Sequence, residues 1–158
     1  MVNSLIGIHA ILGELGIVAF LWVFVEILNS TPSCLRRAKL VACLGVIFFF
    51  ASWIVGGYYY ATDYGSIVKP VIKEGPQPWA HLVFTEAKEH VFLFLPFLSV
   101  LAYALIRKYQ SSLSGDKNPS IKKAILILCI AILVIGAMMA VMGYLISSGY
   151  RIALEAKI

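Results

Sequence analysis

Four long runs of apolar residues, separated by short polar segments, organise this chain. The runs cover residues 4–28, 40–60, 79–106 and 124–146, and the third begins with polar turns. A helix needs about 20 residues to cross a hydrocarbon core of roughly 30 Å, so each run is long enough. Because backbone in lipid must satisfy its own hydrogen bonds, we expect helices rather than open strands. The pattern therefore predicts an all-α fold, an integral membrane four-helix bundle that occupies residues 1–158 as one domain.

The segments between the predicted helices carry turn residues. A Ser-Thr-Pro sequence that ends at Pro32 closes the first run, and a serine- and glycine-rich stretch, 111–119, separates the last two. Prolines at positions 70, 76 and 78 predict a loop over residues 62–78. The first run lacks a basic leading segment and is too long for the core of a signal peptide, so we expect a mature helix there.

Composition supports the membrane assignment and excludes several classes of protein. Of the 158 residues, 61% are hydrophobic and 13% are charged, whereas soluble domains are about 45–50% apolar and about 25% charged. A soluble enzyme, a disordered tail and a disulfide scaffold do not fit these values. The net charge of +5 does not indicate nucleic-acid binding, because the basic residues lie in short segments between apolar runs.

The distribution of basic residues predicts the orientation of the bundle. Eight flank the two short connections on one side: Arg36, Arg37, Lys39, Arg107, Lys108, Lys117, Lys122 and Lys123. Five lie towards the other side: Lys69, Lys73, Lys88, Arg151 and Lys157. Basic loops are typical of the cytoplasmic face. We therefore expect the N and C termini and the 62–78 segment outside, in a bacterial or archaeal cytoplasmic membrane.

Ionisable residues within the predicted spans indicate a candidate functional site, because such groups are costly in lipid. The first span contains His9, Glu14 and Glu26, and the third contains His81, Glu86, Lys88, Glu89 and His90. The second and fourth spans have none in their centres. We therefore look for a site between the first and third helices.

Helix geometry narrows this set to four residues in the outer half of the bilayer. At 1.5 Å per residue, Glu86 lies near the height of His9, and Glu14 lies near that of His90. Glu86 and His90 are four residues apart and share one side of their helix. Lys88 and His81 point roughly the other way.

Three kinds of function fit these residues. The hypothesis we favour is a transition metal, Fe, Zn or Mn, bound by His9, Glu86 and His90 with help from Glu14 or Glu89. Such a metal centre would carry out redox or quinol-linked chemistry. The second is an electron-transfer subunit in which His9 and His90 are the axial ligands of a single haem b. The third needs no cofactor and uses the same groups to conduct protons or a substrate.

A structural subunit remains a further alternative, in which residues 85–90 form a solvated helix turn. The partners we expect are the lipid bilayer, a quinol or another small apolar substrate, and further copies of the chain or a larger membrane complex.

Overall fold

The chain is helical almost throughout in the computed structural model, which describes residues 4–156 apart from the side chain of Asp116. In chain order, the elements are α1 (Ser4–Asn29), α2 (Pro32–Tyr59), the π-helix η1 (Tyr60–Val68), α3 (Lys69–Glu74), the π-helix η2 (Ala80–Thr85), α4 (Glu86–Val91), α5 (Phe94–Leu113), the 3₁₀ turn η3 (Ser114–Asp116) and α6 (Pro119–Glu155). Lys157, which the sequence analysis assigned to the outer side, lies outside the described residues.

The prediction of four long apolar helices is confirmed. The helical stretches that are long and apolar enough to cross a membrane are Ser4–Asn29, Pro32–Glu74, Ala80–Leu113 and Pro119–Glu155. Each covers one of the predicted runs, the third all but its first residue, and the last three extend well beyond the C-terminal or N-terminal limit of the run. The extensions carry polar residues, which a helix tolerates at its ends because their side chains reach water.

The predicted loop over 62–78 is wrong for most of its length. Helix continues through η1 and α3, and only residues 75–78 leave it. Pro70 is accommodated because it stands in the first turn of α3, where a missing amide hydrogen is tolerated. The π-helix η1, which has more residues per turn than an α-helix, immediately precedes α3.

Local signals explain the turn between α1 and α2. Ser30 has a positive φ of 49°, and its hydroxyl donates to the carbonyl of Ile27 at 2.6 Å. Thr31 then caps α2 by accepting a hydrogen bond from the amide of Cys34 at 3.2 Å. Pro32 follows at the start of the helix, where proline is favoured.

The third stretch is interrupted where α4 meets α5. Residues 92–93 keep helical dihedral angles but form a turn in which the amide of Leu95 donates to the carbonyl of Phe92, and Pro96 lies in the first turn of α5. The sequence predicts a distortion here, since Pro96 cannot donate a hydrogen bond to the carbonyl of Phe92. This turn separates the more polar segments η2 and α4 from the apolar helix α5.

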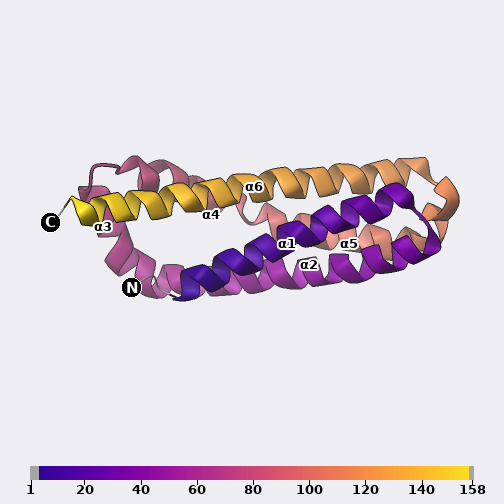
Figure 1. Ribbon diagram of the computed structural model, residues 1–158, viewed down its shortest axis with the longest axis horizontal. Helices are drawn as coiled ribbons and strands as arrows, with labels where there is room; N and C mark the ends of the chain where they lie inside the picture. The colour runs from indigo at the N-terminus through magenta and orange to yellow at the C-terminus, as the bar shows by residue number, and fades with distance from the viewer. Residues whose placement is uncertain (1–3, 157–158) are drawn as a thin grey trace.

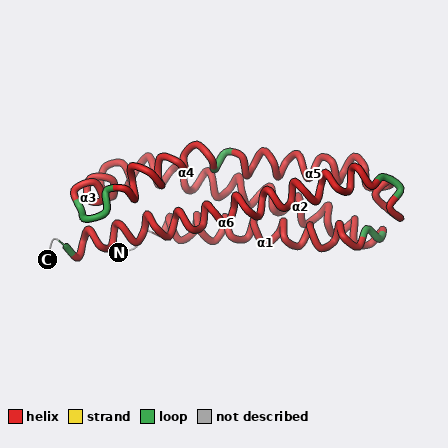
Figure 2. Tube along the Cα trace, turned by 90° about the horizontal axis from the view of Figure 1, so that it is seen from above, coloured by secondary structure: helices red, strands yellow, loops and turns green. Residues whose placement is uncertain are grey.

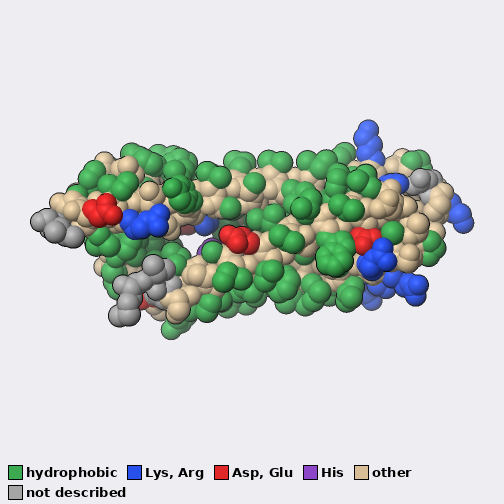
Figure 3. All heavy atoms as spheres, viewed as in Figure 1, with side chains coloured by type: hydrophobic (Ala, Val, Ile, Leu, Met, Phe, Trp, Pro, Cys, Tyr) green, Lys and Arg blue, Asp and Glu red, His purple; other side chains and the backbone are tan. Residues whose placement is uncertain are grey.

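The helices run side by side along one long axis (Figure 1). Around the bundle α1 contacts α2 and α6, and α5 also contacts α2 and α6. The end of α6 lies at one end of the bundle with α3, α1 begins in the same half, and the α1–α2 and α5–α6 connections lie at the other end (Figures 1 and 2). We call these the terminal end and the basic end, because Lys and Arg side chains gather at the second (Figure 3).

Apolar side chains cover the outside of the bundle along most of its length (Figure 3). Large hydrophobic residues are exposed on every long helix, among them Ile11, Leu40, Phe97 and Val141. Such a surface is unfavourable in water and is expected in contact with lipid tails. This coat supports a bilayer as the surroundings of the bundle.

Two apolar cores fill the interior. The larger, which we call the packed core, belongs to the half nearer the basic end and includes Phe20, Ile27, Leu35, Ile106, Ile125 and Ile132, all fully buried. The smaller, the terminal core, consists of Tyr64, Val68, Ile72 and Ala80, with partly buried side chains from α2 and α6 against it.

Candidate functional site

A polar layer lies inside the half of the bundle that contains the terminal end. We define it as His9 of α1, Ser52 of α2 and Lys88 of α4, with Gly56 and Gly143 as the small residues against which the two basic side chains lie. Figure 3 shows an opening in the surface of this half, with histidine and lysine or arginine colours at its edge. Four helical segments therefore contribute to one interior polar region.

His9 is held against α2 by a reciprocal set of hydrogen bonds. Its Nδ1 lies 2.9 Å from the carbonyl oxygen of Ser52 and 3.0 Å from the Ser52 hydroxyl. That hydroxyl in turn donates to the carbonyl of His9 at 2.9 Å. Because a carbonyl can only accept, Nδ1 carries a proton. In the neutral ring Nε2 is then an acceptor.

Gly56 makes this arrangement possible. A Cβ at that position would lie 2.5 Å from Nδ1 of His9, which is far inside van der Waals contact. The imidazole therefore lies directly on the α2 backbone. His9 stands out in the sequence as an ionisable residue in an apolar run, whereas Ser52 and Gly56, the two α2 residues that orient it, do not.

Lys88 extends from α4 across the interior to α6. Its Nζ lies 3.1 Å from the position that a Cβ would take on Gly143. The ammonium is also near enough to His9 to act on it electrostatically. No carboxylate among the described side chains forms an ion pair with it. A charge in this position is costly unless something else compensates it.

A second polar network ties the terminal core together. The hydroxyl of Tyr64 lies 3.0 Å from Nδ1 of His81 and 2.7 Å from the Thr85 hydroxyl, and all three residues are buried. Nε2 of His81 faces the exposed Glu86 carboxylate at 3.6 Å. Each buried member has a partner, so this network stabilises the packing of η1 against η2.

Glu89 is less completely satisfied than its neighbours. Its carboxylate faces Tyr60, but its Oε1 atom is buried and has no hydrogen-bond partner among the described residues. It adds a second uncompensated polar atom to the same short helix as Lys88.

Glu26, the remaining acidic residue of the first span, has a structural role at the basic end. Arg37 donates to both of its carboxylate oxygens, at 2.7 Å from Nε and 2.9 Å from a terminal nitrogen. The Trp22 indole donates a third bond at 2.9 Å. This bidentate pairing compensates the buried carboxylate and links α1 to α2.

The other predicted ligands lie on outward surfaces. Glu14, Glu86 and His90 are exposed, and Nδ1 of His90 donates to the carbonyl of Glu86 in its own helix at 2.6 Å. Among residues 4–156, no three His, Cys, Asp or Glu residues lie close enough together to hold a metal ion. The donor set of the metal hypothesis is therefore not gathered in this arrangement.

The haem hypothesis meets a related difficulty. His9 is half-buried against α2, whereas His90 is exposed. The third histidine, His81, is buried against Tyr64 in the terminal core. No contact in the described part of the chain links the His9 and His90 rings as a pair of axial ligands.

The side of the third helix that faces the interior follows from the buried residues of α5. Ile106, Ala102, Ser99 and Leu95 are buried at intervals of three or four residues. Continuing those intervals towards the N-terminus gives positions 92, 88, 85 and 81. This stripe is a sequence signal that identifies Lys88 and His81 as inward-facing and places Glu86 and His90 outside it.

Comparison with protein-family models, with curated proteins and with solved structures finds no match.

Proposed function

We propose that this chain is a small integral membrane protein that binds a quinone or quinol in its polar layer. The observation that carries the proposal is Lys88, an ammonium placed in the bundle interior without a paired carboxylate. A charged group in a low-dielectric interior is strongly unfavourable unless it is paired or hydrogen-bonded. An electron-rich oxygen of a ligand offsets that cost.

The polar layer offers both kinds of hydrogen-bonding group that this class of ligand needs. Lys88 is a donor suited to a quinone carbonyl or to the developing charge of a reduced oxygen. His9 has Nδ1 committed to Ser52, so Nε2 of the neutral ring is free to accept from a quinol hydroxyl. A carboxylate ligand would use only the first of these groups.

Aromatic residues stand one turn from the polar groups. Phe92 follows Lys88 by four residues, and its ring lies 5.9 Å from that of Trp53, the neighbour of Ser52. Phe50 extends the group, 6.0 Å from Trp53. Rings at these separations form an apolar cluster that reaches the exposed side of α2 at Trp53, and we propose that a flat ring stacks against it. The combination of a few polar groups with apolar walls is typical of small-molecule sites.

The other half of the bundle favours ligand binding over conduction. Below the polar layer, fully buried side chains such as Phe20, Ile106 and Ile132 fill the interior. A path for protons would have to cross this packed core, which offers no chain of polar groups. A metal cation at His9 is also disfavoured, because the Lys88 ammonium would repel it.

The test uses decylubiquinone and the protein in phosphatidylcholine nanodiscs. Quenching of tryptophan fluorescence measures binding, because Trp53 lies beside the site. We expect saturable quenching for the natural chain and at least about tenfold weaker binding for Lys88→Met. A hydrogen bond to a charged group contributes about 1.5–3 kcal/mol, and tenfold in affinity is about 1.4 kcal/mol.

Lys73→Met is the matched control, because it removes an exposed lysine from α3 at the terminal end. It should leave the affinity unchanged. Loss of a partly buried charge should also leave Lys88→Met folded and at least as stable as the natural chain. Equal affinity in Lys88→Met and the natural chain, or no saturable quenching in either, would contradict the proposal.

A further inference from the structure

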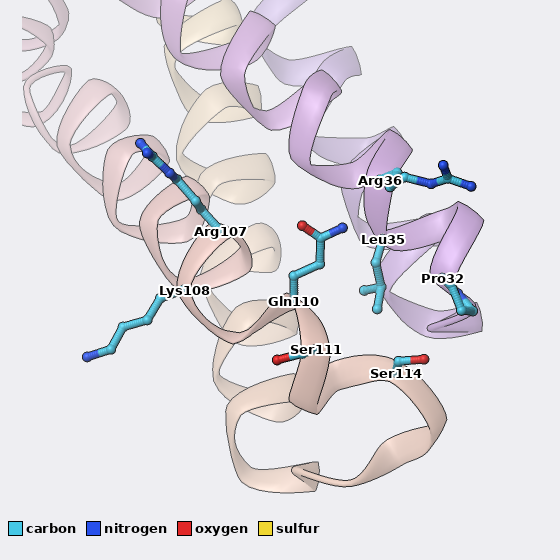
Figure 4. Close-up of a pocket in the computed structure, with 8 residues that line it drawn as sticks. All are labelled: Pro32, Leu35, Arg36, Arg107, Lys108, Gln110, Ser111 and Ser114. Atoms are coloured by element: carbon cyan, nitrogen blue, oxygen red, sulfur yellow. The ribbon is translucent and has the colours of Figure 1, made fainter.

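The basic end contains a pocket between the start of α2 and the end of α5. Its volume is about 420 Å³, in the range of small-molecule sites. The polar side chains that line it are Arg36, Arg107, Lys108, Gln110, Ser111 and Ser114 (Figure 4). This pocket lies at the opposite end of the bundle from the polar layer, so its occupant is independent of the quinone proposal.

The pocket is cationic, and none of the described carboxylates neutralises its charges. Among the side chains that the structure describes, no acidic one lines it. No described carboxylate forms an ion pair with Arg36, Arg107 or Lys108. The adjacent Arg37 differs, because both oxygens of Glu26 bind it. Two consecutive arginines on α2 therefore have separate roles, one structural and one available for an anion.

The side chains that line the pocket do not all point the same way. Figure 4 shows the Gln110 amide between α5 and α2, and the hydroxyls of Ser111 and Ser114 beyond it, pointing away from each other. The charged ends of Arg107, Lys108 and Arg36 extend outwards around this group. Hydroxyl and amide groups can hydrogen-bond a phosphate within the pocket, and the exposed basic chains are long enough to turn onto it.

Apolar surface continues from the pocket along the helices. Leu40 lies four residues after Arg36 on the same face of α2, and Leu101 lies seven residues before Lys108 on α5. Both leucines are exposed, at 63% and 47%. A phosphate bound in the pocket would thus have a path for attached acyl chains beside it. This adjacency favours a lipid over a free anion.

We propose that the basic-end pocket binds the phosphate of an acidic phospholipid headgroup. Arg36, Arg107 and Lys108 supply the charge, and the serine hydroxyls and Gln110 supply hydrogen bonds. The lipid chains lie along the exposed leucines. Basic pockets between spanning helices at the headgroup level are suited to this recognition.

The test titrates the detergent-solubilised full chain with dioleoyl phosphatidylglycerol and counts bound lipid by native mass spectrometry. The variant replaces Arg36, Arg107 and Lys108 with Gln, and its lipid affinity should be at least about tenfold weaker, since each surface Lys or Arg contributes measurably to binding anionic lipid. All three residues are exposed, so the core is untouched and the variant is expected to fold.

The matched control replaces Lys39, Lys117 and Lys123 with Gln, which removes the same charge from the same end outside the pocket. It should retain most of the affinity. Equal losses in the two variants would show that only overall charge matters and would overturn the proposal. Displacement of the lipid by excess inorganic phosphate, with equal binding of phosphate alone, would also overturn it in favour of a free anion.

Discussion

Both halves of the bundle use glycine to bring a side chain close to a neighbouring helix, but the side chains brought close differ in kind. In both halves, glycines let a side chain from a neighbouring helix lie against the backbone. Near the basic end, Gly16 makes room for the Phe49 ring and Gly45 for the Phe20 ring. In the other half, Gly56 and Gly143 make room for an imidazole and an ammonium.

The consequences of these contacts differ. The two phenylalanine rings stack at 6.0 Å and belong to a core with fully buried members on all four long helices. Close packing of this kind stabilises a membrane bundle, because lipid offers no equivalent contacts. His9 and Lys88 gain little from dispersion and retain polar groups without partners. We infer that one half supplies stability and the other binds ligand.

The largest expected effect is the loss of stability when a buried side chain of the packed core is shortened. Phe20→Ala removes a fully buried ring and should lower the free energy of unfolding by about 3–5 kcal/mol. Phe94→Ala makes the same chemical change at a side chain that is 58% exposed and should cost much less. Unfolding in mixed micelles of increasing SDS content measures both. Similar losses in the two variants would mean that Phe20 does not lie in a specifically packed core.

A glycine pair tests the comparison more directly. Gly45→Ala places a methyl group 2.7 Å from the Phe20 ring and should reduce stability by about 1–3 kcal/mol, because a packed ring cannot move aside. Gly143→Ala meets only the flexible end of Lys88 at 3.1 Å. It should leave the thermal midpoint unchanged or slightly raised and should weaken decylubiquinone binding.

The proposal requires that stability falls in Gly45→Ala and that quinone affinity, but not stability, falls in Gly143→Ala. Thermal unfolding followed by tryptophan fluorescence measures the stability, and the quinone titration measures the affinity. If Gly143→Ala lost stability as Gly45→Ala does, the polar layer would be as tightly packed as the core. The division of the bundle into two functional halves would then fail.

The sequence predicts the packed half much better than the polar half. Apolar runs of sufficient length determine the four helices, because lipid leaves the backbone few alternatives. The same argument fails over 62–78, where three prolines indicate a loop. Pro70 starts a new helix there, and the π-helical winding before it has no signature in the pattern.

The sequence is also limited in predicting which polar residues face the bundle interior. Depth and helical phase correctly separate the side of Glu86 and His90 from that of Lys88 and His81. They do not determine which side faces inwards. The spacing of the buried residues in α5 does determine it, but that spacing has to be extrapolated across the turn at residues 92–93. Ser52 and Gly56 are missed because an uncharged residue in an apolar helix carries no desolvation cost that would draw attention to it.

His90 gives the smallest expected effect. It is exposed and bonded only within its own helix, so His90→Ala should change both stability and quinone affinity by no more than about 0.5 kcal/mol, as for other surface positions. His9→Ala is the partner variant, since it removes the ring that Ser52 orients, and it should weaken quinone binding. Metal content and the visible spectrum of both variants complete the measurement. Loss of a stoichiometric metal or of a haem band in His90→Ala would restore the ligand set of the metal or haem hypothesis and move the site to the outer face of α4.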